Sequence, residues 1–109
     1  MERVTIEHID TVVDSATVKR PLTTALNASN LAINYYELAP GDSFAYGYHM
    51  HENQEEIFLI QSGTVVFETE DGTVDVGKGE AIRFAPGDYQ RGENRGTDRV
   101  EAFAIGAPH

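Results

Sequence analysis

The sequence predicts an all-β protein built as a single small barrel or sandwich. Short runs rich in valine, isoleucine, phenylalanine and tyrosine alternate with glycine and proline at short intervals. Short strands with regular turn signals are typical of antiparallel sandwiches and barrels. The chain has 109 residues, which is enough for one hydrophobic core and too few for two. We therefore treat 1–109 as one domain, in which an N-terminal segment, 1–30, leads into a barrel core, 31–107.

The turn signals divide the chain into expected strands at 3–8, 31–38, 43–51, 56–61, 64–70, 73–76, 81–85, 88–93 and 99–105. The clearest hairpin has its turn at Asp71-Gly72, a pair that suits the positive φ angles of a type I′ turn. Only Pro21 to Leu26 offers a short helix, because proline is favoured at the first helical position.

The charge balance excludes several classes of partner. The formal net charge is −10, from 18 acidic and 8 basic residues, and such a surface repels nucleic acid and anionic lipid. Only two of the bases are lysines, Lys19 and Lys78. This composition favours adaptation to a cytosol of high salt over ordinary acidity, because salt screens self-repulsion. The sequence has no apolar run long enough for a membrane span and no signal-peptide core, so we expect a cytoplasmic location.

A histidine pair and a nearby acid suggest a metal site. The chain has no cysteine, so any metal must be held by nitrogen and oxygen. In a strand, His49 and His51 would point to the same face, because residues two apart share a face. Glu56 begins the next expected strand, and two histidines with one carboxylate suit iron(II) and related metals. Glu55 is the alternative carboxylate, and a surface His-x-His beside an acid is the alternative interpretation.

The surrounding residues resemble a known family. Residues 41–63 read GDSFAYGYHMHENQEEIFLIQSG. They resemble the first motif of the cupin superfamily, in which glycine, His-x-His, glutamate and a second glycine follow in order. Residues 79–94 resemble the second motif, a proline–glycine turn followed by a histidine ligand and, four residues later, an asparagine, here Asn94.

The sequence departs from the family pattern at three points. The first glycine-to-histidine gap is two residues longer, Pro86 directly precedes Gly87, and the histidine position of the second motif holds Gln90. The resemblance covers roughly 31–107 and implies a jelly-roll barrel with a metal inside it.

The resemblance implies one divalent ion, which could be zinc, nickel, iron, manganese or copper. Its ligands would be His49, His51 and Glu56, with Gln90 in the fourth position. Gln90 would either coordinate through its amide oxygen, orient a metal-bound water or substrate, or mark a degenerate site. Further candidates for the pocket wall are Tyr36, Gly47, Phe58 and Arg83.

The expected strand 43–51 also predicts assembly. Its histidine face carries small residues, and its opposite face carries Phe44, Tyr46, Tyr48 and Met50. A second copy of the chain would cover this apolar patch, so we expect a homodimer. If the strand parity slips at Gly47, some of these aromatics line the pocket instead.

Two classes of function remain open at this point. The first is a metal-dependent enzyme that acts on a small molecule. The second is a non-catalytic module that binds a small ligand, with a weak or degenerate metal site. The family resemblance does not choose a reaction, because cupins include dioxygenases, sugar-phosphate isomerases and decarboxylases.

Overall fold

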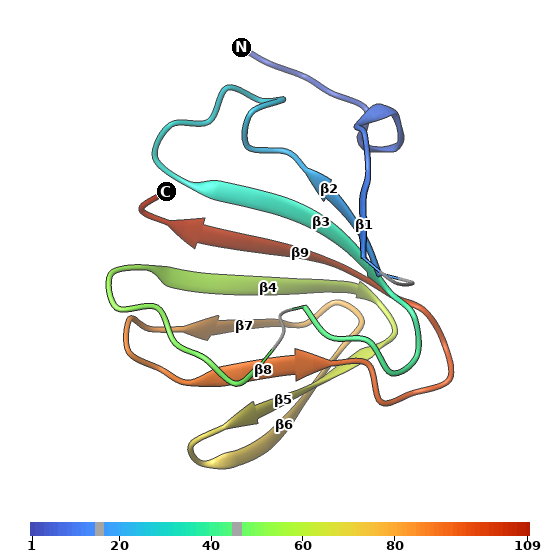
Figure 1. Ribbon diagram of the computed structural model, residues 1–109, viewed down its shortest axis with the longest axis vertical. Helices are drawn as coiled ribbons and strands as arrows, with labels where there is room; N and C mark the ends of the chain where they lie inside the picture. Colours follow the sequence, from blue (N-terminus) through green and yellow to red (C-terminus); the bar gives the residue numbers. More distant parts are fainter. Residues whose placement is uncertain (15–16, 45–46) are drawn as a thin grey trace.

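The chain forms two antiparallel sheets that pack face to face. The computed structural model describes residues 1–14, 17–44 and 47–109 (Figure 1). Within these ranges, a six-stranded sheet has the order β1-β2-β3-β9-β4-β7, and a three-stranded sheet has the order β6-β5-β8. The strands are β1 Val12–Asp14, β2 Thr17–Pro21, β3 Ala32–Leu38, β4 Glu55–Ser62, β5 Thr64–Thr69, β6 Gly72–Gly77, β7 Ala81–Phe84, β8 Gln90–Glu93 and β9 Val100–Ala107. This confirms the predicted all-β jelly-roll fold.

The core lies between the two sheets. Alternate residues of each strand point inward, as the two-residue period of a strand requires. The buried core residues are Leu38, Phe58, Ile60, Val65, Phe67, Val76, Phe84, Val100, Ala102 and Ala104. Partly buried Tyr36, Phe44 and Ile82 pack against them. Two of these positions are alanines, Ala102 and Ala104, and Ala104 leaves space beside it for a cavity between the sheets.

The N-terminal region differs from the expectation. Residues 3–8 form no strand, and Ile6–His8 is a single 3₁₀ turn, η1. The guanidinium of Arg20 donates to the carbonyls of Glu7 at 3.2 Å and Ile9 at 2.6 Å, so this segment is held through its backbone. Strands β1 and β2 instead extend the large sheet from β3. The expected helix at Pro21 to Leu26 is also absent. Pro21 ends β2, and residues 22–28 form turns closed by three backbone hydrogen bonds of 2.9 to 3.0 Å, of which only Leu26 N–H to Leu22 C=O has the spacing of an α-helix.

The predicted hairpin is present, but its turn is not of type I′. Thr69 pairs with Gly72, so Glu70 and Asp71 are the two turn residues. Gly72 has φ +108°, whereas Asp71 does not have a positive φ. The Thr69 hydroxyl explains this turn, because it accepts from the Asp71 N–H at 3.1 Å and donates to the Gly72 carbonyl at 2.7 Å.

The expected strand 43–51 is wrong as a continuous strand. In the described residues of this segment, pairing with β8 is limited to two isolated bridges, Ser43 with Glu93 and His49 with Gln90. The bridges are six positions apart on this segment but three apart on β8. This segment therefore has three more positions between the bridges than β8 has, and because this number is odd, Ser43 and His49 face opposite sides of the sheet and not the same side.

The reversal places Phe44 on the inner side together with His49. The Phe44 N–H donates to the Gly92 carbonyl at 3.1 Å, and its ring stacks against Phe67 in the core. Tyr48 is 45% exposed and stacks on Tyr89, with ring centres 5.3 Å apart. Tyr46 lies outside the described residues. The predicted outer patch of four apolar side chains on this segment is therefore wrong, because one of its members faces the core.

Candidate metal centre

Three side chains with metal-binding donors meet inside the sandwich. His49 and His51 lie in the connection before β4, and Glu56 is the second residue of β4. One ligand atom from each of the three lies within 4.8 Å of those of the other two. The imidazole rings of His49 and His51 are perpendicular, with centroids 5.1 Å apart. The group that the sequence singled out is therefore brought together by the fold.

Backbone contacts fix the position of both histidines. His49 and Gln90 exchange two backbone hydrogen bonds, of 3.1 and 2.8 Å, which attach the histidine segment to β8. The His51 carbonyl accepts from the Gly87 N–H at 2.8 Å. His49 Nδ1 lies 2.8 Å from the Gly47 carbonyl, which can only accept, so Nδ1 carries the proton. This tautomer leaves the Nε2 lone pair of His49 free to coordinate an ion.

Glu56 lies in a mostly dry environment. Its side chain is 18% exposed, and its Oε1 lies 3.7 Å from His51 Nε2. Burial raises the pKa of Glu56 above its usual value, and the imidazoles of His51 and His49 and a hydrogen bond from Gln90 partly offset this rise. A bound cation would favour the ionised form of this carboxyl group.

Gln90, at the start of β8, contacts the same carboxylate. It is 2% exposed, and its Nε2 donates to Glu56 Oε1 at 3.0 Å. A carboxylate has only acceptors, so the amide nitrogen must be the atom that faces it. Gln90 therefore acts on Glu56 through its nitrogen, and its oxygen Oε1 points elsewhere.

The centre opens onto a cavity of about 190 Å³ between the sheets. The cavity is lined by Tyr36, Phe44, His49, His51, Glu56, Phe58, Gln90, Gly92 and Ala104. Two of the expected pocket residues, Tyr36 and Phe58, are in this wall. Burial, with the negative charge of Glu56 adding to it, raises the pKa of Tyr36 to about 12. Its hydroxyl is therefore protonated at neutral pH.

Three residues of the wall were not expected from the sequence. Phe44 is expected on the outer face by regular alternation, and its place in the wall agrees with the alternative in which the parity slips at Gly47. Ala104 carries no chemical signal of its own. At Gly92, an added Cβ would lie 2.5 Å from a ring atom of Phe67, so the close packing of the cavity wall requires glycine there.

Two expected pocket residues lie elsewhere. Gly47 is absent from the wall and contributes only its carbonyl, to His49. The prediction that Arg83 lines the pocket is wrong, because its side chain is 55% exposed and pairs with Glu55 at 2.9 Å. Inward-facing Phe84 follows it on β7, so Arg83 must face outward. The same ion pair places Glu55 outside the cavity, which leaves Glu56 as the carboxylate of the centre.

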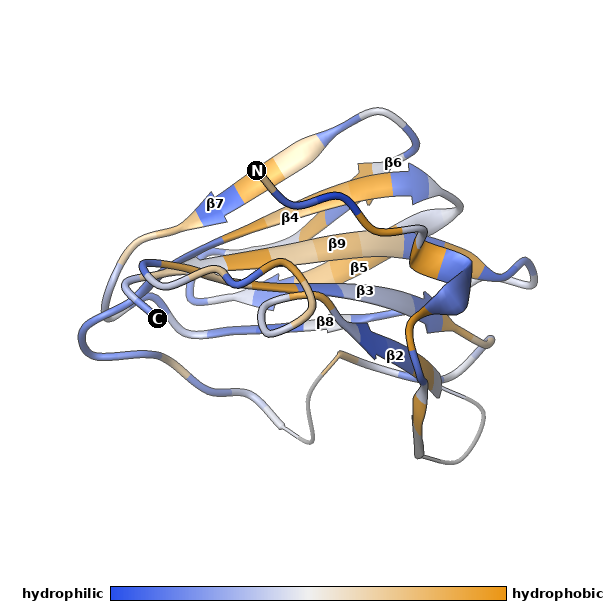
Figure 2. Cartoon of the chain, turned by 90° about the horizontal axis from the view of Figure 1, so that it is seen from above, coloured by the Kyte–Doolittle hydropathy of each residue, from blue (hydrophilic) through white to orange (hydrophobic). Residues whose placement is uncertain are grey.

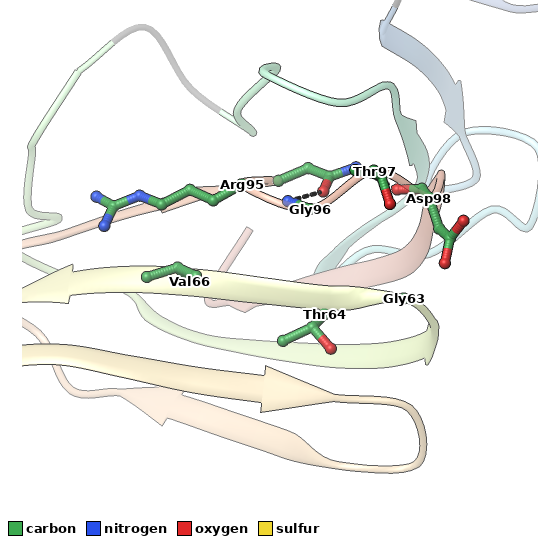
Figure 3. Close-up of a pocket in the computed structure, with 8 residues that line it drawn as sticks. Gly63, Thr64, Val66, Arg95, Gly96, Thr97 and Asp98 are labelled. Atoms are coloured by element: carbon green, nitrogen blue, oxygen red, sulfur yellow. Dashed lines mark hydrogen bonds between the residues drawn. The ribbon is translucent and has the colours of Figure 1, made fainter.

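A second, wider hollow of about 370 Å³ lies outside the sandwich, between the β4–β5 turn and the β8–β9 connection (Figure 3). Its wall is already occupied by internal contacts. Asn94 is 1% exposed, donates to the carbonyls of Leu38 and Asp98, and accepts from the Gly96 N–H. Arg95 pairs with Glu93 and with Glu68. These side chains hold the β8–β9 connection in place. The buried Asn94 is therefore explained by its contacts within the chain, and no bound ligand is needed to account for it.

The donor set at His49, His51 and Glu56 fits a divalent transition metal. Donor atoms on one such ion lie at most about 4.2 Å apart, twice a bond of about 2.1 Å. The observed upper limit of 4.8 Å requires only a small approach of the side chains. The two imidazoles and the carboxylate suit zinc, iron, nickel, manganese and copper.

Comparison with known proteins agrees with this class of small jelly-roll protein. The family model "Cupin domain" matches residues 34–106. The chain therefore belongs to the cupin domain family. No curated protein shows a significant match to the sequence. None of the helical segments in the described ranges is long and apolar enough to cross a membrane.

Several solved structures share the fold. A sugar phosphate isomerase of the cupin superfamily from Silicibacter pomeroyi has a TM-score of 0.88 at 18% identity, over 98% of this chain and 76% of that one. A predicted oxalate decarboxylase from Thermotoga maritima has a TM-score of 0.85 at 23% identity, over 98% and 99% of the two chains. KdgF from Halomonas sp. has a TM-score of 0.80 at 15% identity, over 100% and 95%. Similarity at these identities establishes the fold alone.

Proposed function

We propose that the protein holds one divalent metal ion on His49, His51 and Glu56 and binds a small molecule in the adjoining cavity. The observation that supports this most is the convergence of the three donors within 4.8 Å at the wall of a 190 Å³ cavity. A bound ion of this kind supplies Lewis-acid, templating or oxygen-activating chemistry. The chain's residues would hold it and position the small molecule.

The similar proteins do not choose the reaction. One is called a sugar phosphate isomerase and another a predicted oxalate decarboxylase, and a shared fold hosts many activities. The small molecule is therefore proposed as a substrate or a ligand. Only the three donors and the adjoining cavity favour a metal-dependent enzyme.

The test is removal of the histidines. His49→Ala with His51→Ala should abolish metal content, measured by elemental analysis after loading with Zn²⁺ and desalting. The far-ultraviolet circular dichroism should be unchanged, because neither side chain belongs to the hydrophobic core. His8→Ala with His109→Ala is the matched control, since both histidines are exposed and far from the cavity wall. Unchanged metal content in the first double variant would contradict the proposal.

A second candidate is a non-catalytic binding module with a weak metal site. The observation in its favour is Gln90, whose amide nitrogen, which cannot coordinate a metal, is the atom directed at the group of donors through its hydrogen bond to Glu56. Only three protein donors would then hold the ion. Loss of metal on simple dialysis, together with ligand binding that needs no metal, would favour this candidate over an enzyme.

We also propose a homodimer that forms through the outer face of the six-stranded sheet. Two rows of apolar residues cross this face in register, Ile33–Ile105–Ile57 and Tyr35–Phe103–Leu59, and all but Tyr35, which is already buried within the chain, are at least partly exposed. Figure 2 shows the hydrophobic character of β4 and β9. The charges at the edge are internally paired, Arg83 with Glu55 and Arg99 with Glu37. The face is therefore close to neutral on a molecule of charge −10, so a second copy meets the least repulsion there.

The sheet is also wide enough for such a contact. Strands about 4.8 Å apart give six of them a width of nearly 30 Å. A standard interface needs about 800 Å² from each partner, and twofold pairing is the commonest soluble assembly.

A further inference from the structure

Two polar atoms of the cavity wall have no hydrogen-bond partner among the residues that the structure describes. The amide nitrogen of Gln90 donates to Glu56, and the amide oxygen, Oε1, accepts no hydrogen bond from the residues that the structure describes. Every polar side-chain atom that is fully buried in those residues has a partner, so an unpartnered Oε1 cannot be fully buried. Because Gln90 is 2% exposed and lines the cavity, this oxygen must be reached from the cavity itself. Oε1 can therefore accept a hydrogen bond from a donor group of a molecule in the cavity.

The second such atom is the hydroxyl of Tyr36. Its ring is fixed edge-on against Phe44, with centroids 5.2 Å apart, and it lines the same cavity. The hydroxyl makes no hydrogen bond within the described ranges. By the same reasoning it is not fully buried, so a molecule in the cavity can reach it. A phenol that stays protonated can donate to an oxygen of a bound molecule. The wall therefore offers one acceptor and one donor next to the three metal-binding side chains.

The wall carries no positive side chain. Among its described residues, the only formal charge is that of Glu56. The four undescribed residues include no lysine or arginine. Arg83, Arg91, Arg95 and Arg99 are paired with carboxylates. Lys19 lies 5.9 Å from the centre of the Tyr36 ring, but it does not line the cavity. A phosphate group inside the cavity would have only the proposed ion, and no arginine or lysine, to offset its charge.

We infer that the cavity binds a small hydroxy-carbonyl compound without a phosphate group. A ligand hydroxyl donates to Gln90 Oε1, a ligand oxygen accepts from the Tyr36 hydroxyl, and Phe44 and Phe58 contact the carbon chain. The volume of 190 Å³ equals about six water molecules at about 30 Å³ each, which suits a chain of three to about six carbons. This inference rests on the proposed function and specifies its ligand class.

The test uses matched pairs of probes. Protein loaded with Zn²⁺ is titrated calorimetrically with glyceraldehyde and glyceraldehyde 3-phosphate, dihydroxyacetone and dihydroxyacetone phosphate, and erythrose and erythrose 4-phosphate. The unphosphorylated member of at least one pair should bind, about tenfold or more tightly than its phosphate. Tyr36→Phe removes one hydroxyl and should weaken that binding about threefold to tenfold. Tyr48→Phe is the matched control, because its hydroxyl lies outside the cavity, and should leave binding unchanged.

The metal content of each sample separates the two proposals. Absence of bound Zn²⁺ would contradict the proposed function, and the titrations would still report the ligand class of the cavity. If Zn²⁺ binds, tighter binding of a phosphorylated member would overturn the inference. Loss of that binding in Lys19→Met would assign the phosphate to Lys19. Failure of every probe to bind, or unchanged binding in Tyr36→Phe, would also overturn it.

Discussion

At the scale of single residues, Gln90 decides how many donors the centre has. Its backbone is fixed to His49 by two hydrogen bonds, and its side chain donates to Glu56 Oε1 at 3.0 Å. Neighbours that hydrogen-bond a metal ligand orient it and commonly change metal affinity about 10- to 100-fold. Gln90 is therefore a positioning residue for Glu56, and a different side chain here would change the centre in a measurable way.

Gln90→His is expected to tighten binding of Zn²⁺. An imidazole is a better donor than a neutral amide, and the backbone already holds this residue beside His49. We expect an increase of about tenfold or more in affinity, measured by competition with a chromophoric chelator. An affinity equal to or weaker than that of the wild type would mean that the hydrogen bond to Glu56 contributes more than an added donor.

At the scale of elements, the short strand β8 makes the cavity possible. It has four residues, Gln90–Glu93, of which Gln90 and Gly92 face inward. Because Gly92 has no side chain, the Phe67 ring fills the space beside it. The rings of Phe44, Phe58 and Phe67 then form one aromatic wall, with centroids 4.8 to 6.2 Å apart.

Gly92→Ala should destabilise the fold by about 1–3 kcal/mol, because the new methyl group would overpack the core against Phe67. The free energy of unfolding from urea titration measures this. Gly96→Ala is the matched control, since its added Cβ would lie 3.5 Å from Asn94 Oδ1, an ordinary contact. Equal stabilities of the two variants would show that Phe67 moves aside without cost.

Much of the fold is readable in the sequence, because its strands from β3 onward have clear alternation and glycine turns. The segment 43–51 is the informative failure. Its alternation looks regular in sequence, but β8 offers pairing partners for only part of it. The identities of His49, His51 and Glu56 follow from residue type and spacing. The roles of Phe44, Gly92 and Arg83 depend on which face each strand turns inward, and the three additional positions between the two bridges leave no local signal in the sequence.

At the scale of the whole molecule, the surface combines strong negative charge with one apolar face. Leu59, at the β4 end of one apolar row, is 40% exposed. Because net charge opposes self-association at low ionic strength, the proposed dimer should form most completely when salt screens the charge.

Leu59→Glu should convert the dimer to a monomer in molar potassium chloride, measured by light scattering, because it places a charge within the apolar rows. Val74→Glu is the matched control. Val74 is 44% exposed on β6, in the other sheet, so its substitution should leave the dimer intact. A wild-type monomer at every salt concentration would contradict the proposed dimer.

Thermal stability should also rise with salt. The 18 acidic residues outnumber the 8 basic ones, so screening removes repulsion that is strongest in the folded state. The melting temperature from low salt to molar potassium chloride measures this. A flat curve would remove the interpretation of the acidity as an adaptation to high salt.

The two isolated bridges of segment 43–51 have a consequence for cooperativity. Glu56 and Gln90 belong to strands of the sandwich, whereas His49 and His51 lie in a connection with few ladder bonds. Segments of this kind open with a smaller free energy than core strands do. An ion shared by both parts would tie the connection to the sandwich as a crosslink. Amide hydrogen exchange at 47–54 should then slow when metal is added, while exchange in β4 and β9 stays as it was.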